Sequence, residues 1–407
     1  MNVDDVVREA MREQAADLTP PGPGFADRVL AVRRRRRVRG LATVAAAAAA
    51  VIAVAVGVPA LDSGGEGARP SGGVEQDETI ARTDQSPPRD LLAAGNVALA
   101  AYFTTDKVRL SADRMVSERT YWLLDPRTKK YEKDDRWSFV AVAPGLRTAA
   151  VLERELPADR VGLLDLASGE VERWIPVDHR AGGLAFSPDG RKLVATTYGE
   201  DPGLLLRVED PGGPVGWQPR EISSRNGFQV IDVASGTGSW TEVETSDEPF
   251  GDAGFVNARQ DFAFSADGRL VWAGRVSDTV DLDWFDLAGD AVAPPAREAH
   301  RIWHVDAGLS PDGRRLAGDF AGGMTKTSSW ILEPRTGRKV TEVHGQQLLA
   351  WADNDSLVAW DIGADGNEFH QRLVLVTVGS DEVVPLSGFR SPKDDTKGRW
   401  EPVFARR

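Results

Sequence analysis

The chain has 407 residues, of which 41% are hydrophobic and 27% are charged, and its formal net charge at pH 7 is −13. This length and composition are those of a globular protein that buries a sizeable core. The absence of cysteine excludes disulfides, thiolate metal sites and cysteine nucleophiles. The acidic balance argues against DNA, RNA or anionic lipid as the ligand of the main body.

The N-terminal 40 residues are basic and short for a domain of their own. Nine arginines stand against six acidic residues, and six of the arginines fall within residues 33–39. Apolar side chains recur at helical spacing before Pro20. They are Val3, Val6, Val7, Ala10, Met11 and Leu18. We expect residues 1–40 to be a cytoplasmic segment with a short amphipathic helix, which either lies on the inner leaflet or docks a cytoplasmic partner.

Residues 41–61 carry no charge and predict a transmembrane helix. As a helix the run is about 31 Å long, the thickness of a bilayer's hydrocarbon core. The arginines abut one side alone, which places the N-terminus in the cytoplasm and the rest of the chain outside the cell membrane. Because 40 residues precede the run, a single-pass anchor is favoured over a cleaved signal peptide, although Val58 and Ala60 suit a signal peptidase. A buried soluble helix is the other alternative, since ten of the 21 residues are alanine.

Residues 62–89 are rich in glycine, serine, proline and acidic side chains, and they predict a flexible stalk. Residues 62–407 together hold 40 basic and 56 acidic residues, a net charge of −16. Nine lysines stand against 40 arginines, which is typical of a high-GC bacterial genome. The layout looks like that of actinobacterial membrane-anchored proteins.

Three copies of one phrase dominate the rest of the chain. Each copy is an apolar run, a Ser-x-Asp-Gly-Arg turn and a second apolar run, with the turn at Ser187, Ser265 or Ser310. This pattern predicts two antiparallel strands joined by a tight hairpin. Weaker copies at Ala143 and Ala352 fit the same template. The intervals from Ala143 to Ser187, from Ser265 to Ser310 and from Ser310 to Ala352 are 44, 45 and 42 residues, whereas an insertion lengthens the interval from Ser187 to Ser265 to 78. A period of this length is typical of a propeller blade.

A second phrase follows each hairpin: two apolar residues, usually an aspartate, and then a Ser/Thr-Gly turn. Its six copies begin at Trp122, Leu163, Val230, Trp284, Ile331 and Leu375. We expect the carboxylate to accept backbone N–H bonds in the turn. Together the two phrases resemble the blades of TolB-like and WD-repeat-like propellers of exported bacterial proteins, over residues 90–390. The resemblance implies the fold and says little of function.

We therefore expect an all-β fold, a six-bladed β-propeller over residues 90–407 that the short helix, the transmembrane helix and the stalk precede. Residues 400–404 are expected to return to the first blade and close the ring. A seven-bladed ring is the alternative, because the first blade lacks the Ser-x-Asp-Gly hairpin. In an antiparallel blade these hairpins lie at one face, named the hairpin face, and the loops between blades lie at the opposite, crossover face.

This topology assigns all five histidines to the crossover face, together with two tryptophans and one long insertion. The predicted ligand-binding residues are His179, Trp217, His300, Trp303, His304, His344 and His370. The insertion, residues 199–227, joins the second and third strands of the third blade. Loops on a rigid scaffold suit a binding site, whereas the alternative is that these residues are ordinary solvated loop positions. Other tryptophans, such as Trp351 and Trp360, are expected in the core.

No linear catalytic motif is present, so no catalytic, metal or cofactor-binding residue is assigned. On a strand, His300 and His304 would lie about 13 Å apart, too far to share a metal. The favoured function is a non-catalytic binding, sensing or scaffold module whose crossover face meets a protein or glycan, with no nucleic acid. Two alternatives stay open: a metal-dependent propeller enzyme with its site over the central channel, and an anti-sigma-like transmembrane signal transducer.

Overall fold

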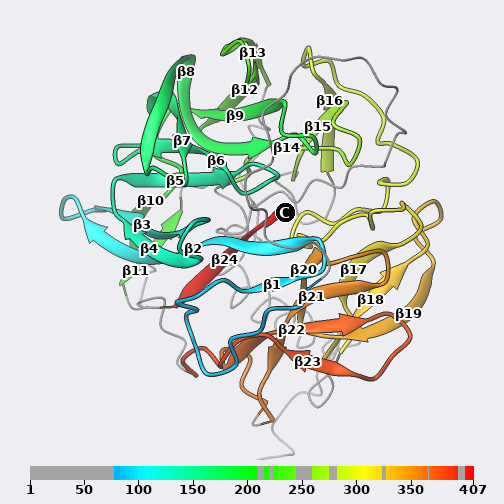
Figure 1. Cartoon of the computed structure of the whole chain (residues 1–407). Helices are drawn as coiled ribbons and strands as arrows, with labels where there is room; N and C mark the ends of the chain where they lie inside the picture. The colour runs from blue at the N-terminus through cyan, green and yellow to red at the C-terminus, as the bar shows by residue number, and fades with distance from the viewer. Residues whose placement is uncertain are drawn as a thin grey trace, which may run out of the picture. The chain divides into compact units, whose positions relative to one another are not determined.

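Every regular element in the described part of the chain is a β-strand (Figure 1). The computed structural model describes residues 78–209, 215–219, 223–243, 259–274, 282–322, 327–364, 366–392 and 399–407. The expected N-terminal helix, the transmembrane run 41–61 and residues 62–77 of the expected stalk lie outside these ranges. Within these ranges no helix is long and apolar enough to cross a bilayer. The all-β expectation is confirmed for the part that is described.

The strands follow the repeats of the sequence. Their bounds are β1 (Ala93–Ala94), β2 (Val97–Arg109), β3 (Arg114–Asp125), β4 (Lys130–Asp134), β5 (Trp137–Val142), β6 (Thr148–Glu153), β7 (Ala158–Asp165), β8 (Glu170–Phe186), β9 (Lys192–Tyr198), β10 (Leu204–Glu209), β11 (Val215–Pro219), β12 (Arg225–Asp232), β13 (Thr237–Glu242), β14 (Ala263–Phe264), β15 (Leu270–Gly274), β16 (Leu282–Asp286), β17 (Leu316–Phe320), β18 (Ser328–Leu332), β19 (Lys339–His344), β20 (Gln347–Trp351), β21 (Ser356–Ile362), β22 (Gln371–Thr377), β23 (Val383–Pro385) and β24 (Trp400–Arg406).

The three Ser-x-Asp-Gly turns are built alike. In the first, Ser187 Oγ donates to Asp189 Oδ1 (2.6 Å) and accepts from Lys192 N (2.9 Å). The same pair of bonds recurs in the turns of Ser265 and Ser310. The glycine that ends each turn has a φ between +68° and +70°, a conformation that residues with a Cβ rarely adopt. The predicted hairpins are confirmed, and their serine and aspartate side chains close them.

The second phrase forms a turn at the same end of the sheets. Asp165 Oδ1 accepts from Ser168 N (2.7 Å), and Asp232 Oδ1 accepts from Ser235 N (2.8 Å). Glu333 makes equivalent bonds in the turn between β18 and β19. Hydrogen bonds from the turn hold the pKa of Asp232 below its ordinary value. The expected role of this carboxylate is confirmed.

The strands form antiparallel sheets in which neighbours in the chain are mostly neighbours in space. One seven-stranded sheet has the order β1-β2-β3-β10-β11, with β24 added at β2 and β4 added at β3, and the other has the order β13-β12-β9-β8-β7-β6-β5. The remaining sheets are β14-β15-β16, β17-β18-β19 and β20-β21-β22-β23. The long strand β8 pairs first with β7 and then with β9, so it ends one repeat and begins the next.

The last strand returns to the first sheet. β24 pairs with β2 in antiparallel register from Val97 with Arg406 to Thr104 with Trp400 (Figure 1). The Trp400 side chain is 2% exposed, and its ring meets that of Trp360 with centroids 5.2 Å apart. The predicted return of residues 400–404 is confirmed, and burial of an aromatic ring holds the strand in place.

Neighbouring turns touch one another at the hairpin face. Asn96 N donates to Ala352 O (2.7 Å), Gly145 N donates to Arg406 O (2.8 Å), and Arg315 Nη1 donates to Asn354 O (2.8 Å). Gly190 and Gly268 lie close to proline rings: a Cβ added at these glycines would be 3.3 Å from Pro144 Cδ and 3.1 Å from Pro188 Cδ, respectively. Of the three hydrogen bonds, the one between Asn96 and Ala352 links the first and the last described sheets.

Most of the tryptophans expected in the core are buried. Trp272, Trp284, Trp351 and Trp360 are between 0% and 8% exposed. Trp330 is an exception, because it is partly exposed beneath Lys339 Nζ, which lies 4.5 Å from the ring centroid. Its strand β18 is the central strand of the sheet β17-β18-β19, and the ring also packs against the buried cluster of Leu309, Leu316 and Leu332.

Two segments differ from their expected form. Residues 78–89, which composition assigns to the stalk, pair with the sheets through Ile80 with Ala93 and Arg82 with Ser387. Backbone hydrogen bonds hold these residues against the sheets, and such bonds leave no apolar periodicity in the sequence. The described fold therefore begins before residue 90. The insertion forms a hairpin, β10–β11, that pairs with β3 through Leu204 and Val116. It thereby crosses from its own repeat to the tip of the β2–β3 hairpin.

Candidate functional site

Six of the seven predicted ligand-binding residues lie at the crossover face. His304 Nε2 is 3.1 Å from Asp319 Oδ1, near the end of β17. His344 Nε2 is 2.5 Å from Asp361 Oδ1, where β19 and β21 end. His370 directly precedes β22. Each of these three histidines is thus held at the edge of the face by a strand terminus.

The insertion and its neighbours supply the other crossover residues. His179 lies where β8 passes from one repeat to the next, and its ring stacks on that of Trp240 with centroids 3.5 Å apart. Arg109 lies over the ring of Trp217 in β11, 5.2 Å from the centroid. Trp303 packs beside the end of β15. The aromatic rings therefore meet protein side chains at the rim of the sheets.

His300 lies at the hairpin face, contrary to its predicted place. A Cβ at Gly337, in the turn between β18 and β19, would lie 2.7 Å from the His300 ring. Residues 296–300 form turns instead of a crossover strand. Glu298 Oε1 accepts from Ala266 N (2.9 Å) in a Ser-x-Asp-Gly hairpin, and this bond draws the segment back to the hairpin face. The simple alternation of loops fails here because the fourth strand of this repeat is reduced to one bridge, between Phe285 and Ala291.

The six residues at the crossover face are spread around it and do not converge on one point. Trp303 and His304 are in ring contact, with centroids 5.0 Å apart, and the others come from different sheets. Among the residues that the structure describes, no group of three or more His, Cys, Asp or Glu side chains is placed to hold a metal ion.

A cavity of about 380 Å³ opens at the crossover face, and none of the seven residues lines it. We name it the crossover cavity. Its walls are the tip of the β2–β3 hairpin, the start of β5, the loop after β6 and the segment between β9 and β10. The charged lining residues are Arg114, Arg119, Arg154, Arg180, Arg259, Glu118, Glu155, Glu200 and Asp201. Nine charged side chains thus surround one small volume.

Ion pairs join the strands around the rim of this cavity. Arg114 Nη2 lies 3.3 Å from Glu200 Oε2, and Arg154 is paired with Glu118. Arg154 Nη1 also donates to Arg119 O (3.0 Å). Because the rim arginines are 49% and 42% exposed, each pair contributes at most about 1 kcal/mol to stability. Their effect is to orient the walls.

The floor holds two buried guanidinium groups over one phenyl ring. Arg119 Cζ lies 5.1 Å and Arg259 Cζ lies 4.7 Å from the ring centroid of Phe139. Each arginine side chain is about 8% exposed. Burial lowers the pKa of Arg119, and the charge of Arg259 lowers it further, whereas the neighbouring Tyr121 raises it. Two like charges therefore share a poorly hydrated site.

A buried network fixes Arg259. Its Nε lies 2.8 Å from Asp261 Oδ2, and the Tyr198 hydroxyl donates to Asp261 Oδ1 (2.8 Å). Gly182 O accepts another guanidinium N–H. Burial opposes the charge, but Asp261 and Tyr198 hold the pKa of Arg259 above its ordinary value. Asp261 packs against Gly183, where a Cβ would lie 2.0 Å from Oδ1, so only glycine fits.

One side of the remaining lining is apolar. Val116 and Leu204 are buried, and Leu156 and Pro157 complete this side. The polar residues Ser117, Ser138, Glu155, Arg180 and Asp201 complete the lining. Burial raises the pKa of Asp201, whose Oδ1 accepts from a backbone N–H (2.7 Å). The cavity therefore combines one apolar side with a largely charged lining.

The sequence pattern predicts neither Arg119 nor Arg259 as a site residue. The available signal is a charge within or near an apolar strand: Arg119 lies inside β3, and Arg259 lies three residues before Phe262, where the next apolar run begins. Which strands bring the two together depends on the packing of distant repeats. A single sequence does not carry that information.

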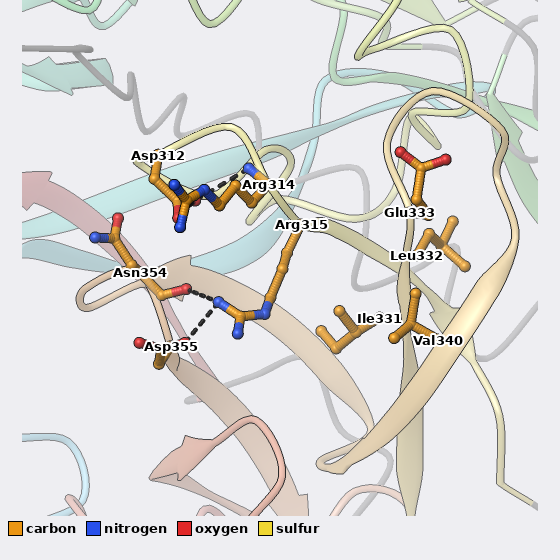
Figure 2. Close-up of a pocket in the computed structure, with 9 residues that line it drawn as sticks. All are labelled: Asp312, Arg314, Arg315, Ile331, Leu332, Glu333, Val340, Asn354 and Asp355. Carbon is orange, nitrogen blue, oxygen red and sulfur yellow. Dashed lines mark hydrogen bonds and ion pairs between the residues drawn. The ribbon is translucent and has the colours of Figure 1, made fainter.

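A second cavity, about 340 Å³, lies at the hairpin face between β17–β19 and β20–β21 (Figure 2). Arg315 Nη1 reaches Asn354 O (2.8 Å) and Asp355 Oδ1 (2.6 Å), with Ile331 and Val340 across the cavity. The arginine contacts thus interlock two adjacent repeats. The crossover cavity, which lies between loops of different repeats and has two buried arginines in its floor, is the stronger candidate site.

Comparisons with known proteins concern the fold alone. No family model and no curated protein matches the sequence. Similar solved structures include hydrazine synthase of Kuenenia stuttgartiensis (17% identity, 64% of this chain, 70% of that chain, TM-score 0.32). The Cps50 (Swd1) β-propeller domain of Myceliophteria thermophila (11%, 68%, 99%, 0.31) and TolB of Acinetobacter baumannii (13%, 71%, 67%, 0.32) are also among them. TolB and a β-propeller domain agree with the resemblance seen in the repeats.

Proposed function

We propose that this chain is a binding module, a six-bladed β-propeller that takes its ligand in the crossover cavity. The observation that carries the proposal is the cavity itself, about 380 Å³ between loops of different repeats with two buried arginines in its floor. Loops held by rigid sheets are where binding residues concentrate. The volume suits a small molecule or a single side chain.

Six repeats support the blade number. They are β24-β2-β3-β4, β5-β6-β7 with the start of β8, the end of β8 with β9-β12-β13, β14-β15-β16, β17-β18-β19, and β20-β21-β22-β23. The bond from Asn96 N to Ala352 O joins the sixth repeat to the first. An experimental structure with a seventh sheet inserted between any two of these would contradict the number.

We extend the proposal to a location in the cell. The uncharged run 41–61 and the six arginines within residues 33–39 support a single-pass anchor with residues 1–40 in the cytoplasm. The propeller would then lie outside the membrane, where a binding or sensing module meets extracytoplasmic ligands. The acidic charge of residues 62–407 is compatible with such an environment.

Filling the cavity tests the binding proposal. Ser117 lines the cavity, whereas Ser239 is an exposed residue of β13 far along the chain. Thermal unfolding of the full chain is followed with a panel of small metabolites, for the natural sequence and for Ser117→Phe and Ser239→Phe. We expect ligands that stabilise the natural chain and Ser239→Phe but not Ser117→Phe. The proposal would be contradicted if the same ligands stabilised Ser117→Phe as much as the natural chain, or if no member of the panel stabilised the natural chain.

A further inference from the structure

The charges around the crossover cavity are balanced. Five arginines and four carboxylic side chains line it, and Asp261 beside the floor brings the carboxyl groups to five. Ion pairs join three of the arginines to carboxylates: Arg114 with Glu200, Arg154 with Glu118, and Arg180 with Asp159. A ligand with a charge of its own would leave one sign in excess, which is costly in a partly buried site.

The two guanidinium groups in the floor are already bonded within the protein. Arg119 Nη1 donates to the Tyr121 hydroxyl (3.2 Å). Arg259 donates to Asp261 and to Gly182 O. Because these contacts satisfy donors of both arginines, the floor does not require an anionic ligand. A group that enters the cavity therefore meets polar neighbours whose charges are matched.

One side of the lining is apolar and continues from strand to strand. Val116 in β3 and Leu204 in β10 are register partners, and they are 7% and 4% exposed. Leu156 and Pro157, from the loop after β6, complete this side. An apolar body that covers these side chains gains free energy as it leaves water. The volume of about 380 Å³ is near the lower end of the range for small-molecule sites, so the ligand is compact.

We infer that the crossover cavity binds a compact uncharged molecule, with its apolar body against Val116, Leu156 and Leu204 and a neutral hydrogen-bonding head, an amide or a hydroxyl, beside the charged lining. The inference rests on the proposed function and specifies the ligand class of that same site. A neutral head exchanges hydrogen bonds with water for hydrogen bonds with the lining. A charged head gives up part of its hydration without gaining a counter-charge.

Four probes test the ligand class. Isothermal titration calorimetry of the full chain at constant ionic strength compares hexanamide, hexanoate and hexylammonium, which share one apolar body. The fourth probe, acetamide, has the head of hexanamide without most of its body. We expect hexanamide to bind at least about tenfold more tightly than each of the other three. An affinity of any of these three that equals that of hexanamide would overturn the inference.

Variants that break one ion pair test the role of charge balance. Arg154→Met leaves Glu118 unmatched, so the affinity of hexylammonium relative to hexanamide should rise about threefold or more. Glu118→Gln leaves Arg154 unmatched and should raise the relative affinity of hexanoate instead. Arg160→Met is the matched control, because Arg160 pairs with Glu153 (2.8 Å) at similar exposure and neither residue lines the cavity. Its relative affinities should equal those of the natural chain.

A leucine variant tests the apolar side. Leu156→Ala removes apolar surface from the lining, and hexanamide affinity should fall about threefold or more. Leu287→Ala is the control, because both leucines are partly buried against a core cluster but Leu287 does not line the cavity. Equal hexanamide affinities of the two variants would show that the body does not pack on Leu156.

The outcomes separate this inference from the function on which it rests. If hexanoate or hexylammonium is the tightest probe and Ser117→Phe blocks it, the cavity is a binding site for a charged ligand and the inference alone is wrong. The inference also fails alone if metabolites bind in the cavity but hexanamide does not, or if breaking the Arg154–Glu118 pair changes no relative affinity. If no probe and no metabolite binds, both proposals fail.

Discussion

The Tyr198 hydroxyl lies 2.8 Å from Asp261 Oδ1 and thereby ties β9 to the segment that carries Arg259. Asp261 in turn holds Arg259 Nε at 2.8 Å, so a tyrosine from one repeat sets the position of a cation from the next. The guanidinium then reaches over Phe139 of a third repeat. The cavity floor is thus a product of contacts between repeats, and each contact can be changed alone.

Replacing Tyr198 by phenylalanine should loosen this floor. The buried Asp261 carboxylate loses one donor, which we expect to lower the free energy of unfolding by about 1–3 kcal/mol in urea titrations. Tyr131→Phe is the control, because the Tyr131 hydroxyl donates to Leu99 O (2.7 Å) away from the cavity. Both variants should lose stability, whereas binding of a ligand from the thermal panel should weaken in Tyr198→Phe alone. Unchanged binding in Tyr198→Phe would show that this bond does not position Arg259.

Gly183→Ala should be costly for a steric reason. A Cβ there would lie 2.0 Å from Asp261 Oδ1, so the carboxylate and Arg259 must move. We expect a loss of about 1–3 kcal/mol in thermal or urea unfolding, the usual effect of overpacking. Gly216→Ala in β11 meets no atom within 4 Å and should change stability by less than about 0.5 kcal/mol. Similar stabilities for the two variants would refute the described contact.

Asp306 should make the stability of the fold depend on pH. Burial raises the pKa of Asp306 well above 3.8, against the effect of Arg301, so the native state holds this proton more tightly than the unfolded chain does. Its favourable contribution is present below pH 3.8 and is lost as the pH rises through the raised value. An asparagine side chain at this position would stay neutral, and its amide oxygen could accept the bond that Gln347 Nε2 donates (3.1 Å).

Asp306→Asn is therefore expected to be more stable than the natural chain at pH 7. The gain arises because the natural chain loses stability as the pH rises through the raised pKa of Asp306, whereas the asparagine variant does not. Urea unfolding between pH 4 and 8 measures it, and the difference should shrink as the pH falls. A variant that is less stable than the natural chain at pH 7 would show that the ionised form is the favoured one.

The proposed anchor predicts which part of the chain a protease reaches in intact cells. Protease added outside should cut between the run 41–61 and the sheets, and should leave residues 1–40 protected. Antibodies against the two ends of the chain report the fragments, and lysed cells serve as the control for cleavage of residues 1–40. Protection of the C-terminal strand together with loss of residues 1–40 would reverse the proposed orientation.

The repeats carry most of the fold because the local chemistry is complete in each copy. The side-chain bonds that close the turn at Ser187 and Asp189 join residues at most five positions apart, so a short stretch of sequence predicts the hairpin. The return of β24 follows from an apolar run left without a partner. His300 shows the limit, because its place depends on a bond between Glu298 and Ala266 that no local pattern encodes.

The candidate site is less accessible to sequence reasoning than the fold. Arg119 and Arg259 are far apart in the chain and meet over Phe139 through the packing of separate repeats. The sequence favours the histidines because they are rare and polar, yet the structure spreads four of them around the crossover face and places His300 at the hairpin face. Placing a site of this kind requires the distances between repeats, which depend on every strand between them.

The most direct measurement is the position of a bound ligand. Crystals of the full chain are soaked with a ligand that stabilises the natural chain in the thermal panel, and the ligand is located in the electron density. The account predicts the ligand inside the crossover cavity, and no ligand there in crystals of Ser117→Phe. A ligand in the cavity beside Arg314 and Arg315 instead, or an empty crossover cavity at saturating concentration, would contradict it.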